Sequence, residues 1–434
     1  MKRFQLAFVS LFLGLMHPCG IQAAKPNIIL IMADDLGYEC LGANGSTSYK
    51  TPRLDALAKT GLRFVHCYSQ PLCTPSRVQI MTGRYNDRNY SDFGYLPPSE
   101  TTFAHMVKQE GYATLIAGKW QLNGITRRRQ GFRDKTRPFD AGFDEFCLWQ
   151  VDQLKGKGER YADPLIVQNG ETLPRDSNAY GPDIFCHYIL DFIDRHQTQP
   201  FFVYYPMVLT HDPFVPTPDS PEWHTARQAK NDRYFAHMVN YMDKIVGQIA
   251  DHLNEQGLAE NTLLMFTGDN GTHRRLVTQT ATGSVQGGKG TMLNAGTHVP
   301  FVVSWKGHTP QGRVNDDLID FSDFFPTICD AAGVDLPADL MLDGQSFLPQ
   351  LKGEIGNPRN TVFCHYDPRW GNFSQWRGRF ARDKQFKLYM DGRFYNVVED
   401  ELEKAVIHPT QVSPWEISRK QRLQAALNKK AFRH

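Results

Sequence analysis

Apolar runs alternate with amphipathic stretches between residues 25 and 350. Near-continuous apolar runs predict buried β-strands at residues 27–33, 114–117, 201–205, 263–267 and 301–305. Runs with so few polar interruptions are typical of strands in a sheet that is covered on both faces. The pattern therefore predicts a buried sheet at the centre of the fold.

The stretches between these runs carry apolar residues at helical spacing. Thr51 is expected to cap a helix that begins at Pro52 and stops at Gly61, because threonine, proline and glycine favour those positions. Further helices are predicted at residues 182–196, 232–256 and 320–332. Since strands alternate with helices, we predict an α/β fold with a doubly wound, mostly parallel sheet.

The pattern changes after about residue 350. Short strand-like pieces with tight turns follow at residues 361–364, 378–380, 386–390 and 393–397. A basic, helix-like tail begins at Pro414. We therefore predict a large domain at residues 25–350 and a small antiparallel α+β subdomain at residues 351–434.

Residues 1–24 have the pattern of a secretory signal peptide. Lys2 and Arg3 precede an apolar run at residues 6–16, and the small residues Ala23 and Ala24 follow. The run is shorter than the ~20 residues that cross a bilayer. Export to the periplasm or outside the cell is therefore expected, with no membrane span. The net charge of +2 gives no strong field for nucleic acid, and we expect no such partner.

The chain has eight cysteines. Cys19 lies in the predicted signal segment, and Cys73 belongs to a motif described below. The remaining ones are Cys40, Cys67, Cys147, Cys186, Cys329 and Cys364. Export permits disulfides, whereas buried reduced thiols fit the same spacing, and so no pairs are assigned.

Acidic and amide side chains directly follow two predicted strands. Asp34 and Asp35 follow the first, and Asp269 and Asn270 follow the strand at residues 263–267. In open α/β sheets, sites form beyond the carboxyl ends of the strands. Converging carboxylates repel one another without a cation, and their hard oxygens suit Ca²⁺ or Mg²⁺. One such pair would indicate only a solvated turn, but two pairs at two strand ends predict a cation site.

The most specific motif is Cys73-Thr74-Pro75-Ser76-Arg77, followed by Thr82-Gly83-Arg84. Pro75 suits the first turn of a helix, which places Cys73 at or just before the helix N-terminus. Free backbone N–H groups and the helix dipole attract anions there. Arg77, one turn further on, can add a charged contact.

These residues resemble the type I, formylglycine-dependent sulfatases (arylsulfatase-like) of the alkaline phosphatase superfamily. In that family C-x-P-S-R followed by T-G-R marks a cysteine that is converted into formylglycine, and the match here is complete. The resemblance covers most of residues 25–350. It also includes Asp34-Asp35, Thr51-Pro52-x-Leu54-Asp55-x-Leu57, Gly118-Lys119-Trp120, Thr267-Gly268-Asp269-Asn270-Gly271, Gly287-Gly288-Lys289-Gly290 and Val299-Pro300-Phe301.

The resemblance implies that residues 25–350 form a catalytic domain that hydrolyses sulfate esters. The hydrated aldehyde made from Cys73 would be the nucleophile, and His211 would protonate the leaving oxygen. One Ca²⁺ would be held by Asp34, Asp35, Asp269, Asn270 and the modified Cys73. The sulfate oxygens would be bound by Arg77, Lys119 and Lys289. The implied partners are a formylglycine-installing enzyme and a sulfated carbohydrate or other sulfate ester.

The chain departs from the family pattern at three places. Gln121 stands where the family has a histidine that hydrogen-bonds the formylglycine. Glutamine can orient a hydroxyl but cannot accept a proton at ordinary pH, so our hypothesis is that another base or water assists sulfate elimination. The other departures are Asn294-Ala295-Gly296-Thr297-His298 and Tyr395-Asn396-Val397-Val398.

Two other functions fit the sequence. Phosphonate monoester or phosphodiester hydrolysis would use the same tetrahedral-anion site, and a non-catalytic glycan-binding relative would explain Gln121. The tryptophans Trp149, Trp223, Trp370 and Trp376 are candidates for stacking on sugars, although large aromatics more often serve the core. The basic runs at residues 127–137 and 155–160 are expected to be solvated loops. The sulfated position and the oligomeric state are not readable from the sequence.

Overall fold

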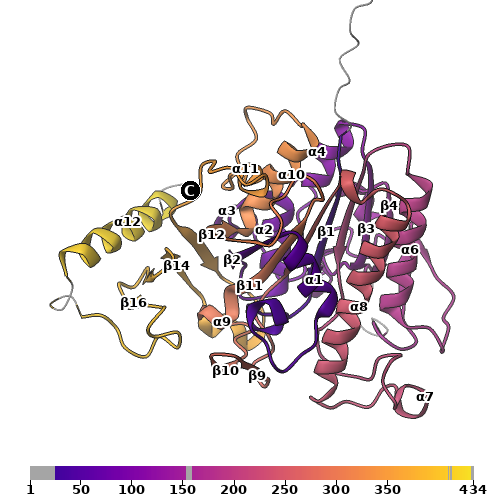
Figure 1. Cartoon of the computed structure of the whole chain (residues 1–434), viewed down its shortest axis with the longest axis horizontal. Helices are drawn as coiled ribbons and strands as arrows, with labels where there is room; N and C mark the ends of the chain where they lie inside the picture. The colour runs from indigo at the N-terminus through magenta and orange to yellow at the C-terminus, as the bar shows by residue number, and fades with distance from the viewer. Residues whose placement is uncertain (1–24, 153–158, 409, 411–412, 432–434) are drawn as a thin grey trace, which may run out of the picture.

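A ten-stranded sheet of order β12-β2-β11-β8-β1-β7-β3-β4-β5-β6 forms the centre of the computed structural model (Figure 1). The structure describes residues 25–152, 159–408, 410 and 413–431, so the predicted signal peptide lies outside the described residues. The strands are β1 (Asn27–Ala33), β2 (Leu62–Tyr68), β3 (Ala113–Lys119), β4 (Glu145–Trp149), β5 (Ile166–Gln168), β6 (Glu171–Thr172), β7 (Phe201–Pro206), β8 (Thr262–Gly268), β11 (His298–Ser304) and β12 (Arg313–Asp320).

The central strand β1 is buried on both faces, as its unbroken apolar run predicts. Its side chains alternate between two separate cores. Ile28, Leu30 and Met32 point into one core. Ile29 and Ile31 point into the other. Each face of the sheet therefore requires its own layer of helices.

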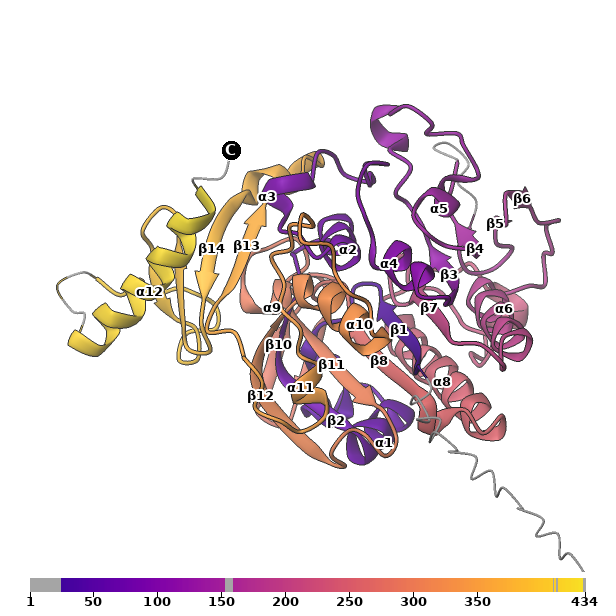
Figure 2. The same cartoon turned by 90° about the horizontal axis from the view of Figure 1, so that it is seen from above.

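Helices cover both faces of the sheet (Figure 2). The core that contains Leu30 also holds α2 (Cys73–Thr82), α4 (Phe103–Gln109), α10 (Phe324–Ala332) and α11 (Leu348–Leu351). The core that contains Ile31 holds α1 (Pro52–Thr60), α6 (Gly181–Arg195) and α8 (Tyr234–Glu255). The predicted doubly wound α/β architecture is confirmed.

The strands that precede the predicted site run in one direction. β8, β1, β7, β3 and β4 are neighbours with parallel registers. β11 is antiparallel to both β8 and β2, so β2 also runs parallel to β8. The carboxyl ends of these parallel strands therefore meet at one edge of the sheet. Strands β11 and β5 run opposite to the others, so the sheet is mixed but mostly parallel.

The predicted helices form, with two local differences. Residues 320–332 form a 3₁₀ turn, η5 (Phe321–Asp323), before α10 begins at Phe324. Thr51 precedes α1, but its hydroxyl accepts from Gly42 N and donates to Asp55 instead of capping the helix. The Asp243 carboxylate of α8 accepts hydrogen bonds from the backbone N–H groups of Arg53 and Leu54, with N–O distances of 2.9 and 2.8 Å. The prediction of Thr51 as the capping side chain was wrong because a residue distant in sequence satisfies these N–H groups.

A second sheet of order β13-β14-β15-β16 follows in the C-terminal part of the chain. Its antiparallel strands are β13 (Val362–Tyr366), β14 (Gly378–Arg382), β15 (Phe386–Tyr389) and β16 (Phe394–Asn396). One face packs on α12 (Pro414–Ala431) through Leu423 and Leu427. The opposite face packs on the start of α2, including Cys73. The four predicted strands and the closing helix are confirmed.

The remaining elements are short. Two strands, β9 (Val277–Thr280) and β10 (Gly283–Gln286), form a separate hairpin. The short helices are α3 (Asn86–Asn89), α5 (Arg137–Asp140), α7 (Trp223–Ala226), α9 (Asn294–Thr297), η1 (Tyr38–Cys40), η2 (Gly42–Asn44), η3 (Ile125–Arg127), η4 (Ala259–Asn261) and η6 (Gly371–Trp376).

The cysteines of the described region are all buried and free of disulfides. Burial raises the pKa of the Cys40, Cys67 and Cys147 thiols, which keeps them protonated. Of the two alternatives that the sequence left open, the described residues therefore adopt buried reduced thiols.

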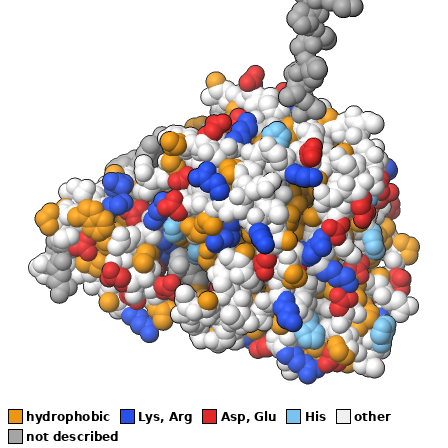
Figure 3. All heavy atoms as spheres, viewed as in Figure 1, with side chains coloured by type: hydrophobic (Ala, Val, Ile, Leu, Met, Phe, Trp, Pro, Cys, Tyr) orange, Lys and Arg blue, Asp and Glu red, His pale blue; other side chains and the backbone are white. Residues whose placement is uncertain are grey.

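The surface mixes charges of both signs. On the face seen in Figure 3, Lys and Arg lie among Asp and Glu without a large patch of one sign. Within the described residues, no helix combines the length and apolar character needed to cross a membrane.

Candidate active site

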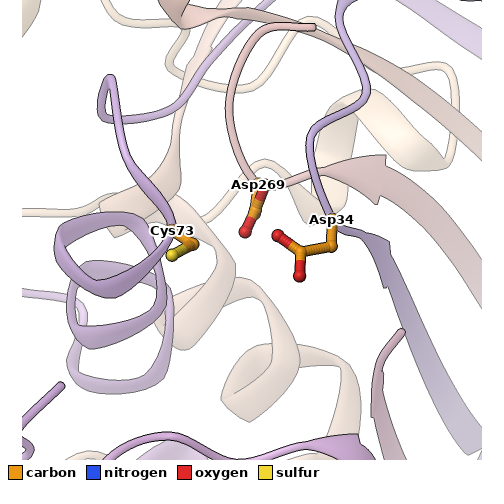
Figure 4. A group of neighbouring side chains, drawn as sticks. All are labelled: Asp34, Cys73 and Asp269. Carbon is orange, nitrogen blue, oxygen red and sulfur yellow. The ribbon is translucent and has the colours of Figure 1, made fainter. Parts of the chain in front are cut away.

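Four elements position the predicted site residues at one edge of the central sheet. Asp34 and Asp35 follow β1, Asp269 follows β8, and Lys119 ends β3. Cys73 is the first residue of α2, as its motif predicts. The side chains of Asp34, Cys73 and Asp269 are neighbours, and their candidate ligand atoms lie within 4.8 Å of each other (Figure 4).

Hydrogen bonds hold the acidic residues in place. Asp35 has a left-handed backbone with φ of 62°, and its N–H donates to Asp269 Oδ1 at 2.9 Å. The Asn270 amide donates to Asp35 Oδ1, also at 2.9 Å. Asp34 N donates to Leu209 O, which ties the end of β1 to the loop after β7. These bonds fix three carboxylates close together in a buried site.

Burial and mutual repulsion act on the pKa values of the three carboxyl groups in this cluster. Burial, reinforced by the charges of Asp34 and Asp35, raises the pKa of Asp269 well above its ordinary value. Burial likewise raises the pKa of Asp35, although Lys289 opposes it. Burial would also raise the pKa of Asp34, but Lys119, Lys289 and Arg160 outweigh it and the pKa is lowered. The site thus requires positive charge to keep its carboxylates ionised.

Two buried lysines supply part of that charge. Lys119 Nζ donates to Asp34 Oδ2 at 2.7 Å, and Lys289 Nζ donates to Asp35 Oδ2. Burial opposes the charged form of both lysines, but Asp34 and Asp35 outweigh it and the pKa of each is raised. Both lysines are therefore cationic, and two positive charges face three carboxylates.

The oxygen atoms of this cluster fit a hard cation. Asp34 Oδ1 and Asn270 Oδ1 are buried and have no hydrogen-bond partner among the described residues. Buried polar atoms are rarely left without a partner, and each such atom costs about 1–3 kcal/mol. Carboxylate and amide oxygens are the ligands that Ca²⁺ and Mg²⁺ prefer. The residues present therefore suit a divalent cation beside Cys73.

Cys73 is buried at the mouth of this cluster, with a relative exposure of 3%. Burial raises the pKa of its thiol, although Lys119 opposes the shift. The unmodified thiol is accordingly a protonated, poor nucleophile. A cysteine that acts directly as a thiolate does not suit this environment.

Arg77 lies one helical turn after Cys73 but does not contact the pocket surface. It is fully buried and donates to Trp120 O at 2.5 Å and to Lys119 O. Its Nε is buried and has no hydrogen-bond partner in the part of the chain that the structure describes. The guanidinium thus fastens the end of β3 to α2 and fixes the backbone that carries Lys119.

His211 follows β7 and reaches the same pocket. Its Nδ1 lies 2.6 Å from Asp212 O, and its Nε2 lies 3.2 Å from Lys289 Nζ. Burial, with the charges of Lys289, Arg160 and Lys119, lowers the pKa of His211 well below its ordinary value. The imidazole is therefore neutral, with a proton on Nδ1, and its Nε2 accepts a hydrogen bond from Lys289.

Gln121 lines the pocket beside Cys73. Its backbone adopts the left-handed region with φ of 50°, where residues other than glycine are uncommon. Its N–H donates to Gln150 O at 3.1 Å, and its buried Oε1 has no partner among the described residues. The side chain is thus held at the pocket with a free acceptor.

The pocket in front of Cys73 has a volume of about 300 Å³. Besides the predicted residues, it is lined by Leu72, Phe93, Arg160, Asp212, His273, Arg274, Trp370 and Phe373. The expectation of a solvated loop at residues 155–160 was wrong for Arg160, because the side chain packs on Trp149. Residues 155–158 lie outside the described residues.

Two of the four candidate tryptophans belong to the core. Trp149 and Trp223 are buried there. Trp370 is 38% exposed, stacks on Phe93 at 4.6 Å and lines the pocket. Trp376 lies under the Arg274 guanidinium at 4.3 Å. Aromatic surface at the pocket therefore comes from the segment around η6 and from Phe93.

Glycines of the family-like motifs permit close backbone packing at the site. A Cβ on Gly271 would lie 1.8 Å from Ala295 O. Gly290 has φ of 83°, and a Cβ there would lie 2.3 Å from the Phe373 ring. The second contact brings η6 against the loop that carries Lys289, which closes one side of the pocket.

The fold and site define a hydrolase of the alkaline phosphatase superfamily that acts on a tetrahedral anionic ester. The sulfatase family profile matches residues 26–334, and the profile of the C-terminal region of N-sulphoglucosamine sulphohydrolase matches residues 288–428. The chain belongs to the sulfatase family and is a sulfuric ester hydrolase.

The curated relatives agree with this assignment. Arylsulfatase A of Bos taurus is 33% identical over 79% of this chain and 71% of its own length. N-acetylgalactosamine-6-sulfatase of Mus musculus is 32% identical over 81% of this chain and 71% of its own. Steryl-sulfatase of Mus musculus is 28% identical over 85% and 72%.

Solved structures share the fold along nearly the whole chain. The crystal structure of Ps i-CgsB has a TM-score of 0.76 and 25% identity, covering 94% of this chain and 93% of that one. The phosphonate monoester hydrolase of Agrobacterium radiobacter has a TM-score of 0.67 and 19% identity, covering 93% and 96%. The fold alone therefore does not separate sulfur from phosphorus chemistry.

Proposed function

We propose that the protein is an exported sulfatase that removes sulfate from a sulfated carbohydrate through a formylglycine made from Cys73. The observation that carries the proposal is the position of Cys73, which begins a helix and faces Asp34 and Asp269. Relatives named for sulfated sugars, such as N-acetylgalactosamine-6-sulfatase, support the carbohydrate substrate.

The cation proposed for the site is one Ca²⁺. Its ligands would be Asp34, Asp35, Asp269, Asn270 and the modified residue 73. When bound, it would polarise the hydroxyl of residue 73 and neutralise sulfate oxygens. The buried, unpartnered oxygens of Asp34 and Asn270 support this ligand set, and an all-oxygen site suits calcium.

The proposed nucleophile is the hydrated aldehyde at position 73. One of its hydroxyls attacks sulfur, the bond between sulfur and the ester oxygen breaks, and the proton lost by the attacking hydroxyl balances the one taken up by the leaving alcohol. Water or another base then takes the proton of the second hydroxyl, the carbon–oxygen bond to sulfate breaks, and the aldehyde re-forms. Water restores the hydrate, so the balance is one ester and one water consumed for one alcohol and one hydrogen sulfate. The raised thiol pKa of Cys73 is consistent with a need for conversion.

The charged residues around position 73 have separable roles. The ammonium groups of Lys119 and Lys289 bind sulfate oxygens and offset the charge that moves onto them. Arg77 was predicted to bind sulfate, but its bonds to the Lys119 and Trp120 carbonyls support a positioning role.

His211 is proposed to give a proton to the leaving oxygen. The neutral imidazole must first be protonated on Nε2, and Lys289 Nζ lies 3.2 Å from that atom. A bound sulfate adds negative charge beside His211, which raises its pKa toward the range of a general acid. The alcohol then leaves as a neutral molecule.

Maturation and location complete the proposal. Residues 1–24 would direct export to the periplasm or outside the cell and would be removed. An enzyme that converts Cys73 into formylglycine is required before the protein is active. The motif around Cys73 would allow such an enzyme to select this one cysteine.

The test is sulfate release by the purified protein, with conversion of Cys73 measured by peptide mass. The panel holds sulfated polysaccharides, their oligosaccharides, an aryl sulfate, a phosphonate monoester and a phosphodiester. Sulfate release that is lost in Cys73→Ala and after calcium removal supports the proposal. Cleavage of only the phosphorus esters by the converted protein would assign the alternative hydrolase. Binding of glycans with no cleavage of any ester would assign the non-catalytic role.

A further inference from the structure

The pocket is lined by two arginines in addition to the two lysines that are proposed to bind the scissile sulfate. Of the described residues that line it, Lys119, Lys289, Arg160 and Arg274 are cationic, whereas Asp212 is acidic. The two lysines are already paired with Asp34 and Asp35. Arg160 and Arg274 form no ion pair within the described part of the chain, and Arg160 acts on Asp34 only through the longer-range effect of its charge.

Arg160 is the more constrained of these two arginines. It is 94% buried, since its relative exposure is 6%, and it packs over the Trp149 ring at 4.1 Å. Its Nη1 is buried and has no hydrogen-bond partner among the described residues. A guanidinium held rigidly on an aromatic face with a free N–H group is preorganised for an anion.

Arg274 stands on the exposed side of the same pocket. It follows the metal-site segment after β8 and packs over the Trp376 ring at 4.3 Å. Trp370 and Phe373 add apolar surface to the pocket wall. A sugar ring that packs on these aromatic residues can present substituents to both arginines.

We propose that Arg160, assisted by Arg274, binds a second anionic group of the substrate. This inference rests on the proposed function and narrows its substrate class to sugars that carry a further sulfate or a carboxylate near the scissile sulfate. The scissile sulfate itself is bound by Lys119 and Lys289. Arg160 and Arg274 are therefore specificity residues that favour acidic saccharides over neutral ones.

The test compares three substrates with the converted, calcium-loaded full-length protein. They are a monosulfated neutral sugar, the same sugar with a second sulfate, and a disaccharide that joins the sulfated sugar to a uronic acid. We expect kcat/KM to be at least about tenfold higher for one or both doubly acidic substrates, since a charge-assisted hydrogen bond contributes on that scale. The two acidic substrates separate sulfate from carboxylate recognition.

Variants test whether the two arginines cause the preference for doubly acidic substrates. Arg160→Gln is expected to remove most of the preference, Arg274→Gln part of it, and Arg160→Lys to retain a fraction. Arg133→Gln, at an exposed residue outside the pocket, is the matched control. Thermal midpoints confirm that each variant folds.

Two kinetic outcomes would overturn the inference. One is a wild-type protein without preference for either acidic substrate. The other is an equal loss on all three substrates in Arg160→Gln, which would assign Arg160 to the scissile sulfate. Calorimetric binding of the same sugars to calcium-loaded Cys73→Ala reports recognition without turnover. If no ester is cleaved, the proposed function fails, while this binding comparison still decides the role of Arg160.

Discussion

Lys289 Nζ lies 3.2 Å from His211 Nε2 while it also donates to Asp35. One ammonium group thus connects the proposed proton donor to the acidic cluster. After burial, the charge of Lys289 is the largest cause of the lowered pKa of His211. The state of His211 is therefore set by Lys289 as well as by the substrate.

Replacement of Lys289 by methionine tests this connection. Lys289→Met is expected to lower kcat about 10²- to 10³-fold, the usual loss when one group that stabilises the transition state is removed. The pKa of His211 should rise because a nearby positive charge is removed. Sulfate release and an NMR titration of His211 measure the two effects. Lys306→Met, at an exposed lysine, is the control; an unchanged kcat in Lys289→Met would contradict the assigned role.

Calcium removal is expected to destabilise the protein as well as inactivate it. Without the cation, three carboxylates face two lysines in a buried site. Calcium at about a hundred times its Kd should add about 2.7 kcal/mol to the free energy of unfolding. Thermal unfolding with and without a chelator measures the shift.

Asp269→Asn is expected to remove most of this calcium-dependent stabilisation. The substitution removes one repelling charge, so the calcium-free variant should be more stable than the calcium-free wild type. Calcium should then stabilise it little, because a ligand charge is lost. Asp219→Asn, at an exposed carboxylate, serves as the comparison. A full calcium-dependent shift in Asp269→Asn would exclude this residue as a ligand.

Gln121→His tests how sulfate is eliminated. Gln121 places a buried, unpartnered oxygen at the pocket, but it cannot act as a base. Histidine at this position should speed the breakdown of the sulfated intermediate and reduce any burst of alcohol release. Stopped-flow measurements of alcohol and sulfate separate the two steps. Unchanged burst and sulfate rates would show that Gln121 does not limit elimination.

His298 gives a prediction about stability and pH. Its ring stacks on Tyr38 at 4.1 Å, and Nε2 lies 2.8 Å from Val65 O. Burial, with Arg382 nearby, lowers the pKa of His298 from 6.5 to about 3. The folded protein therefore holds the neutral ring, while the unfolded chain takes up a proton as the pH falls below 6.5. Its contribution to stability is complete above pH 6.5 and is lost progressively toward pH 3.

Chemical denaturation between pH 7.5 and 4.5 measures this loss. One such histidine makes the free energy of unfolding fall by up to about 1.4 kcal/mol per pH unit. His298→Gln should lower stability at pH 7.5 but flatten the dependence below pH 6.5. His187→Gln, at an exposed histidine, should leave the slope as it is. An equally steep slope in His298→Gln would assign the acid sensitivity elsewhere, such as to His66, whose pKa burial lowers to about 4.

Local sequence was sufficient to predict that Asp34, Asp269 and Cys73 come together. Asp34 and Asp269 each follow a strand whose apolar run is unambiguous, and those strands are direct neighbours in the sheet. Cys73 begins a helix because Pro75 follows it in the first turn. In each case the residue and the element that positions it are adjacent in sequence.

The rest of the fold depends on pairing that the local pattern does not contain. β12 is rich in polar residues, yet it pairs with β2 at the edge of the central sheet. Arg160 was expected in a solvated loop because nothing in its own run indicates that it packs on Trp149. Trp370 reaches the pocket only because the second sheet packs on the start of α2. These contacts join segments that are far apart in sequence.

The packing of the second sheet against Cys73 has a consequence for the order of events during synthesis. Residues 362–397 cover the start of α2 and are synthesised after it. Until they are made, Cys73 and its motif lack this cover. If Cys73 is converted as proposed, the modifying enzyme would have a limited interval in which to reach the thiol before the C-terminal strands pack over it. A substitution that speeds their docking would then shorten that interval and lower the fraction of converted protein.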